Sequence, residues 1–183
     1  KRRMIYGLLQ LNLPIISKAQ DLEKGLAFSF MADLDPGIQA ETFEGISKVT
    51  TGHANGLITI NLAEADDVLR EKAKNEMQES YRTLLGHFRH EIAHYYWDLL
   101  IRNSPRLPNF EMIFGDWRKD YGLALQRYYS SDVLANWNED FISPYATAHP
   151  WEDFAETWAH YMHMTGTLET AFEYGMMKNL EIP

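Results

Sequence analysis

The sequence contains no cysteine, and this absence removes several classes of protein from consideration. Disulfide scaffolds, cysteine-ligated zinc ribbons, thiol catalysis and iron–sulfur clusters all require a thiol, so none of them is built from these residues. The absence is typical of a reducing compartment, and we expect a cytoplasmic protein.

The sequence also lacks long apolar runs and an excess of positive charge. No window approaches the roughly 18 unbroken apolar residues of a transmembrane helix. The 17 Lys and Arg against 26 Asp and Glu give a net charge of −9, which disfavours binding to nucleic-acid phosphates and to anionic lipids. We therefore expect no nucleic-acid partner and no association with a membrane.

Enough apolar residues are present to form one sizeable core. The chain has 183 residues, of which 45% are apolar, and this length suits a single domain over residues 1–183. It opens Lys1-Arg2-Arg3, with neither an initiator Met nor an apolar export segment, so we interpret it as a fragment of a longer protein. The pattern does not indicate an oligomeric state.

The hydrophobic pattern changes from strand-like to helical near residue 65. Before that point, Leu26–Met31 and Leu57–Leu62 predict strands, and the Asn55-Gly56 pair favours a hairpin. After it, apolar residues recur at helical spacing. Helices are predicted up to Met77, over 80–102, 110–114 and 121–129, from Pro150 to about Thr165 with an end at Gly166, and from about Leu168. The pattern predicts an α+β fold, with a small, mostly antiparallel N-terminal sheet and a mainly helical C-terminal part.

The residues His90-Glu91-Ile92-Ala93-His94 form an HExxH sequence inside the longest predicted helix. Residues four apart lie one turn apart on the same helix face, so both imidazoles can reach one metal ion. Glu91 lies beside them, where it would serve as general base toward a water molecule that Zn²⁺ activates. An ordinary helix with two surface histidines would show the same five residues. The apolar flanks, however, place this helix in the interior, where buried polar side chains need a partner.

A catalytic zinc ion usually has three protein ligands, and the predicted helix over 150–163 is the best source of the third. Its Glu152, Glu156 and His163 share one face. One carboxylate can ligate the metal while the other orients a ligand imidazole, and we choose Glu152 as the ligand because it lies in the first turn. The alternative is an amphipathic helix whose acids face water. His160 and His163 are more simply explained as solvent-facing or hydrogen-bonded histidines than as a second metal site.

Three stretches of the chain resemble a bacterial family of zinc-binding metallopeptidases. They are Tyr81–Asp98, which carries the HExxH sequence, Phe114–Asp116, and Tyr145–Tyr161. The resemblance extends over about 57–175, and it implies a zinc-dependent peptidase domain with a peptide or protein as its substrate. Members of the family often carry an N-terminal zinc ribbon, which is absent from these residues.

The segment from Tyr145 to Glu156 is similar, more distantly, to lethal-factor-type gluzincins. In that group a Tyr precedes a Glu by seven residues, and Phe-Ala-Glu follows. The similarity implies a zincin-like fold, with the sheet packed on the active-site helix. It makes Glu152 the third zinc ligand, Tyr145 the hydroxyl that stabilises the oxyanion, and Glu156 the carboxylate that orients a ligand. Asp153 stands where that group has an aromatic residue.

These features predict a gluzincin-type peptidase with one Zn²⁺ per chain, held by His90, His94 and Glu152. Water activated by the ion would attack the peptide bond, with Glu91 as general base and Tyr145 as oxyanion stabiliser. By analogy with gluzincins, the strand over 57–62 would bind an extended substrate through backbone hydrogen bonds.

Two other functions remain open at this point. The first is a non-catalytic binding module that keeps its zinc for structure or for recognition of a partner. The second is a carboxylate-bridged di-iron protein, because Glu91-Ile92-Ala93-His94 also has the Glu-x-x-His spacing. A di-iron site needs a second copy of that spacing, which the sequence does not supply, and a strand-rich N-terminal part fits a helix bundle poorly. Metal analysis separates one zinc from two irons.

Overall fold

The N-terminal segment and the C-terminal half of the chain belong to the same compact unit. A computed structural model describes residues 1–32, 51–66, 83–130 and 136–176. The chain divides into two compact units, one made of Lys1–Pro14 with Leu85–Pro183 and the other of Ile15–Leu84. Every residue predicted to hold the metal ion falls in the first of these, which we call the larger unit.

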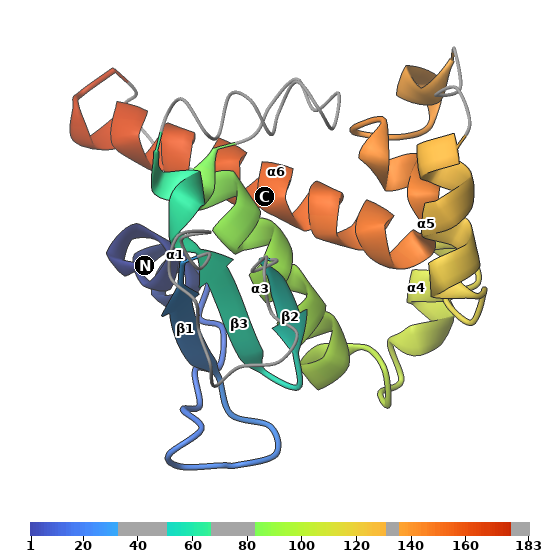
Figure 1. The fold of residues 1–183 in the computed structure, drawn as a ribbon. Helices are drawn as coiled ribbons and strands as arrows, with labels where there is room; N and C mark the ends of the chain where they lie inside the picture. Colours follow the sequence, from blue (N-terminus) through green and yellow to red (C-terminus); the bar gives the residue numbers. More distant parts are fainter. Residues whose placement is uncertain (33–50, 67–82, 131–135, 177–183) are drawn as a thin grey trace, which may run out of the picture. The chain divides into compact units, whose positions relative to one another are not determined.

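The smaller unit contains a three-stranded sheet with β3 in the centre (Figure 1). Its elements are β1 (Ala27–Met31), β2 (Gly52–Ala54), β3 (Leu57–Asn61) and a 3-10 turn at Leu62–Ala65. Asn55 and Gly56, which join β2 to β3, have positive φ angles of 47° and 78°, as tight hairpin turns require. β2 therefore pairs with β3 in the antiparallel sense, and the predicted hairpin is confirmed.

The other pairing in the sheet is parallel, with Ala27 of β1 opposite Leu57 of β3. The sheet is therefore mixed, where the sequence had suggested a mostly antiparallel one. Parallel strands are joined by a crossover connection rather than by a tight turn, so no local turn signal announces them. Only the hairpin half of the sheet carried such a signal.

Helices form most of the described part of the larger unit. They are α1 (Arg2–Gln10), α3 (Leu84–Leu100), α4 (Leu107–Phe114), α5 (Tyr121–Ser130) and α6 (Pro150–Glu173), with 3-10 turns at Trp137–Glu139 and Tyr145–Ala148. The long helices α3 and α6 cross, and α4 and α5 lie near the beginning of α6 (Figure 1). The predicted α+β class and the mainly helical C-terminal part are confirmed. In the described segments, no helix has the length and apolar character needed to cross a bilayer.

The last predicted helix boundary is wrong, because α6 continues through Gly166 to Glu173. A glycine inside a helix costs about 1 kcal/mol relative to alanine, and this cost made Gly166 an expected end. A Cβ atom at Gly166 would lie 3.3 Å from Arg89 Nη2 and 3.5 Å from Arg3 Nη2. Gly166 thus does not end the helix, and its lack of a side chain leaves space for two arginine side chains at the surface of α6. The helix predicted up to Met77 lies outside the described residues.

The helix α1 was not expected from the sequence, and it belongs to the larger unit. Met4 and Leu8, one turn apart, are fully buried. A Cβ atom at Gly7 would come within 3.0 Å of Met162 Cε, so α1 packs closely on α6. This helix has nine residues and buries only two of them, which is too few to show a helical period in the sequence.

Aromatic side chains fix the end of α3 against α4 and against the beginning of α6. Trp97 is fully buried, and its ring centroid lies 5.6 Å from that of Phe110 and 5.2 Å from that of Trp151. Phe154, one turn farther along α6, packs edge-on against Phe110 at 5.8 Å. Such edge-to-face contacts add to the free energy gained from burial. They set how α3 and α6 face each other at the site described next.

Candidate metal centre

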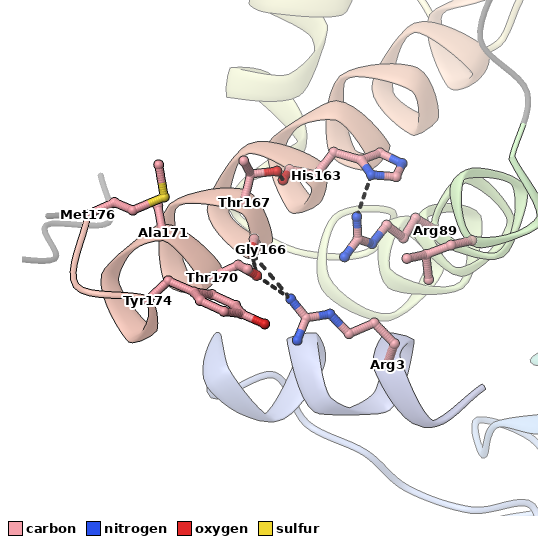
Figure 2. Close-up of a pocket in the computed structure, with 10 residues that line it drawn as sticks. Arg3, Arg89, His163, Gly166, Thr167, Thr170, Ala171, Tyr174 and Met176 are labelled. Atoms are coloured by element: carbon pink, nitrogen blue, oxygen red, sulfur yellow. Dashed lines mark hydrogen bonds between the residues drawn. The ribbon is translucent and has the colours of Figure 1, made fainter.

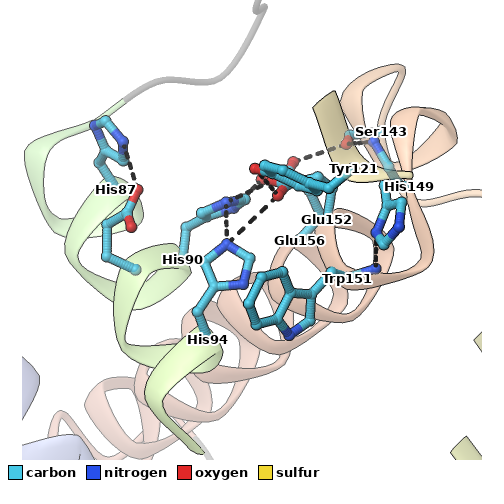
Figure 3. Close-up of polar contacts among 11 residues, drawn as sticks. His87, His90, His94, Tyr121, Ser143, His149, Trp151, Glu152 and Glu156 are labelled. Carbon is cyan, nitrogen blue, oxygen red and sulfur yellow. Dashed lines mark hydrogen bonds and ion pairs between the residues drawn. The ribbon is translucent and has the colours of Figure 1, made fainter. Parts of the chain in front are cut away.

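The HExxH sequence lies in the most deeply buried part of α3. All ten residues from Phe88 to Trp97 are buried, including His90 and His94, which are each 8% exposed. The two histidines are one turn apart, and their rings point from α3 toward α6 (Figure 3). Burying two imidazoles costs free energy unless each forms a polar contact, so both rings need partners on α6.

The first turn of α6 carries Glu152, which is 1% exposed. The helix begins at Pro150, and the His149 side chain caps it by accepting a hydrogen bond of 3.1 Å from Trp151 N. The other ring nitrogen of His149 donates to Lys119 O at 3.1 Å. The cap therefore joins the start of α6 to the segment before α5, and it fixes the turn from which Glu152 extends.

The His90, His94 and Glu152 side chains meet in one buried cluster, as Figure 3 shows. His90 Nε2 lies 3.3 Å from His94 Nε2 and 3.0 Å from Glu152 Oε2, and His94 Nε2 lies 3.6 Å from Glu152 Oε1. Donor atoms about 2.0–2.1 Å from a tetrahedral zinc ion are about 3.3–3.4 Å from one another. The spacings in the cluster, and its pair of imidazoles with one carboxylate, fit such an ion.

The outer nitrogen of His90 is held from α6 as well. His90 Nδ1 lies 2.7 Å from Glu156 Oε1, and the Ser143 hydroxyl donates to Glu156 Oε2 at 2.7 Å. Ser143 in turn accepts a hydrogen bond from Ala146 N. A carboxylate on the outer nitrogen fixes the tautomer and the ring orientation of a metal-binding histidine. The structure thus brings Glu156 to the position where it would orient a ligand.

A further hydrogen bond reaches Glu152 from α5. The Tyr121 hydroxyl donates to Glu152 Oε1 at 2.7 Å. Its ring packs edge-on against His149 at 5.3 Å and against Trp151 at 5.9 Å, so the tyrosine is held by the same residues that cap α6. The Glu152 carboxylate is thereby oriented from a second helix.

The charges in the cluster follow from these contacts. Burial raises the pKa of Glu152, but its contacts with His90 and His94 outweigh this effect and hold that pKa at about 2. Burial lowers the pKa of His90, yet its hydrogen bonds with Glu152 and Glu156 place the pKa well above the ordinary value. Burial is the main influence on His94 and lowers its pKa. The cluster therefore presents ionised carboxylates to the imidazoles.

The two predicted catalytic residues both lie beside His90, Glu91 as its neighbour in the chain and Tyr145 through a ring contact. Glu91 Oε1 contacts His87 Nε2 at 3.2 Å, and these two residues are one turn apart on α3. Burial raises the pKa of Glu91, but His87, His90 and His94 together lower it to about 2. The Tyr145 ring centroid lies 5.9 Å from that of His90, and burial raises the pKa of the Tyr145 phenol. At neutral pH Glu91 is ionised and Tyr145 is protonated.

The two histidines of α6, His160 and His163, are not part of this cluster. His160 Nδ1 contacts Glu156 O at 2.8 Å, and His163 Nδ1 contacts Arg89 Nη1 at 2.6 Å. Within the described segments, His90, His94 and Glu152 are the one group of three such side chains close enough to share a metal ion.

Sequence analysis missed three residues that support the site, namely Tyr121, Ser143 and His149. A signal for His149 was present, because Pro150 marks the first helical residue and the residue before it is the cap. Tyr121 and Ser143 carry no local signal. They reach the carboxylates only because the chain around them folds back on α6.

Comparison with known proteins places the chain in a family described as zinc-binding. The chain matches, over residues 1–182, the model of a family described as "Putative zinc-binding metallo-peptidase". The chain belongs to this family. Uncharacterized proteins of Mycobacterium bovis and Mycobacterium tuberculosis are 47% identical to it over 177 residues, which cover 96% of this chain and 49% of each relative. The chain thus spans about half the length of the curated relatives it matches. The search of solved structures gave no significant match.

Proposed function

We propose that the chain is a gluzincin-type peptidase that binds one zinc ion through His90, His94 and Glu152. The observation that carries the proposal is the buried meeting of these three side chains, at spacings that suit tetrahedral zinc, in a chain from a zinc-binding family. Glu156 would keep its hydrogen bond to His90 Nδ1 while Nε2 faces the ion.

A bound zinc ion would supply Lewis-acid chemistry, lowering the pKa of a water molecule to about 7 and polarising the peptide carbonyl. Glu91 is the base in this proposal. It follows His90 on the same buried turn, and the neighbouring histidines lower its pKa, so the carboxylate is in the ionised form that a base requires. It would then deliver that proton to the leaving amine.

Tyr145 is the proposed donor to the oxyanion that forms on the peptide carbonyl. Burial, with the nearby Glu152 carboxylate, raises the pKa of its phenol, so the hydroxyl keeps the proton that it must share. Its ring packs against His90 at 5.9 Å and against Tyr128 at 5.5 Å, which limits its motion. Loss of one oxyanion donor typically lowers kcat about 10²–10³-fold, so Tyr145→Phe is expected to have an effect of that size.

The decisive experiment compares metal content and peptide cleavage in the wild type, Glu91→Gln and Glu152→Gln. Wild type should bind one zinc per chain and cleave members of a peptide library. Glu91→Gln should keep the zinc and lose cleavage, because it removes only the base. Glu152→Gln should lose zinc affinity and cleavage together. Cleavage by Glu91→Gln at the wild-type rate would contradict the role of Glu91.

The same measurements test the two alternatives. A wild-type chain that holds one zinc and cleaves nothing in the library would be a binding module. Two irons per chain would indicate the di-iron protein. The peptide substrate and the cytoplasmic location remain predictions, and they concern a chain that spans about half the length of its relatives.

A further inference from the structure

His87 lies on α3 just before the HExxH sequence, and the proposed mechanism gives it no role so far. Its Nε2 atom lies 3.2 Å from Glu91 Oε1, a contact that Figure 3 draws as the dashed line at His87. The His87 side chain is 16% exposed and the Glu91 side chain 8%, so the contact is largely shielded from water. Its position beside the proposed base raises the question of what it contributes there.

His87 contacts the HExxH sequence at two points. Residues three and four apart are neighbours on a helix, so His87 meets both His90 and Glu91. The rings of His87 and His90 pack edge-on, with centroids 6.3 Å apart and planes at 74°. The ring contact with His90 limits how the His87 imidazole can turn while its Nε2 atom faces the Glu91 carboxylate.

The contact with His87 restricts the orientation of the whole carboxylate. The two oxygens of a carboxylate lie in one plane with their carbon, so holding Oε1 also sets the direction of Oε2. Because His87 Nε2 is on Oε1, Oε2 is the oxygen left to meet a water molecule. A general base works only when its oxygen comes within about 2.6–3.2 Å of the atom that gives up the proton. The orientation of Glu91 therefore matters as much as its charge.

Burial makes Glu91 depend on such a partner. The residue is 6% exposed, and a buried carboxylate without a hydrogen bond is costly. Without the His87 imidazole, the Glu91 carboxylate would turn toward another donor. It would then lose the orientation that the proposed reaction needs.

We propose that His87 is the positioning residue for Glu91, holding Oε1 so that Oε2 faces the water molecule that attacks the peptide bond. The proposal rests on the proposed peptidase function and adds a residue to it. His87 acts only through Glu91 and contacts neither the substrate nor the ion. It keeps its own proton while Glu91 takes one from water and gives it to the leaving amine.

Two variants separate the hydrogen bond from the packing of the ring. His87→Phe keeps a ring and removes the donor, and it should lower kcat about 10–100-fold with little change in KM, because peptide binding is not touched. His87→Gln keeps a donor without a ring and should recover most of the lost kcat. The reverse order, with an active His87→Phe and an inactive His87→Gln, would assign His87 to packing and overturn the proposal.

Zinc affinity distinguishes a residue that holds the base from one that holds the metal. Loss of a group that orients a ligand typically costs about 10–100-fold in metal affinity, whereas both His87 variants should bind zinc about as tightly as wild type. Competition with a chromophoric chelator measures this. A loss of that size in both variants would assign His87 to the metal instead of to Glu91 and overturn the proposal.

The matched control is the same replacement at a histidine of α6. His163 contacts Arg89 and not a carboxylate, as Figure 2 shows, so His163→Phe should keep the wild-type kcat. A fall in kcat as large as that of His87→Phe would overturn the proposal, because it would mark a general effect of replacing a histidine in this unit.

Urea unfolding tests the contact without relying on zinc or on cleavage. In His87→Phe, Glu91→Gln and the double variant, residues in contact should show effects that do not simply combine. The unfolding constant of the double variant should differ about threefold or more from the product of the single effects. Simple combination would overturn the proposal even in an active peptidase. If wild type cleaves no peptide, the proposed function fails, and this measurement still decides whether His87 holds Glu91.

Discussion

The Tyr121 hydroxyl donates a hydrogen bond of 2.7 Å to Glu152 Oε1, and it thereby joins α5 to the first turn of α6. Burial raises the pKa of Tyr121, and the Glu152 charge raises it further, so the phenol remains a donor at any pH at which the protein would work. One oxygen of the proposed zinc ligand is thus oriented from outside its own helix.

Removing that hydroxyl should weaken zinc binding. Tyr121→Phe frees the Glu152 carboxylate to rotate, and changes to such supporting residues typically cost about 10–100-fold in metal affinity. Competition with a chromophoric chelator measures the effect. Tyr6→Phe is a matched control, because the Tyr6 hydroxyl donates to Glu169 far along α6. An equal loss of affinity in the control would contradict a specific role for Tyr121.

The hydrogen bonds behind His90 should also contribute to zinc affinity. Glu156→Ala removes the acceptor of His90 Nδ1, and we expect a loss of about 10–100-fold. Ser143→Ala removes one hydrogen bond to Glu156 but leaves the Glu156 carboxylate on His90 Nδ1, so its loss of zinc affinity should be smaller, about tenfold or less. If both act through one chain of contacts, Ser143→Ala in the Glu156→Ala background should change nothing more. Additive losses in the double variant would separate the two residues.

The cap of α6 should be measurable as stability. His149→Ala removes the acceptor for Trp151 N, and loss of an N-cap typically lowers the free energy of unfolding by about 0.5–2 kcal/mol. His149→Asn keeps an acceptor at the cap and should recover most of the loss in urea unfolding. If asparagine recovers nothing, the contribution comes from the bond to Lys119 O instead of from the cap.

His163 should make the fold less stable in mild acid. Burial and the Arg89 charge lower its pKa to about 4 in the folded chain, against about 6.5 for an unfolded histidine. Between these values the unfolded chain binds a proton that the folded chain refuses, so stability falls as the pH drops from about 6.5 to about 4. The melting temperature of His163→Gln should fall less than that of wild type over this range. Parallel pH profiles would contradict this prediction.

The core of the candidate site could be predicted from the sequence because helix geometry is local. Spacing alone placed His90 and His94 on one face of a helix, and Pro150 marked the turn that carries Glu152. The structure brings these three side chains together, while their binding of zinc stays a prediction. The contribution of Tyr121 could not be foreseen, because it depends on how α5 packs against α6.

The parts of the fold that sequence analysis missed also depend on contacts between distant segments. The parallel pairing of β1 with β3 has no signal in either strand alone. Gly166 resembles a helix end until Arg3 and Arg89 are seen to approach it from two other helices. In both places the deciding neighbour is remote along the chain, and local propensity was outweighed.

The His90 imidazole fixes how far α6 is shifted along α3. Glu152 and Glu156 lie one turn apart on α6, and each contacts one of the two nitrogens of the His90 ring. A shift of α6 along α3 by a single turn, about 5.4 Å, would break the contact of one of these carboxylates with His90. The residues that would bind the ion therefore also select the alignment of α3 with α6, and any redesign of the donor set would disturb the packing of both helices.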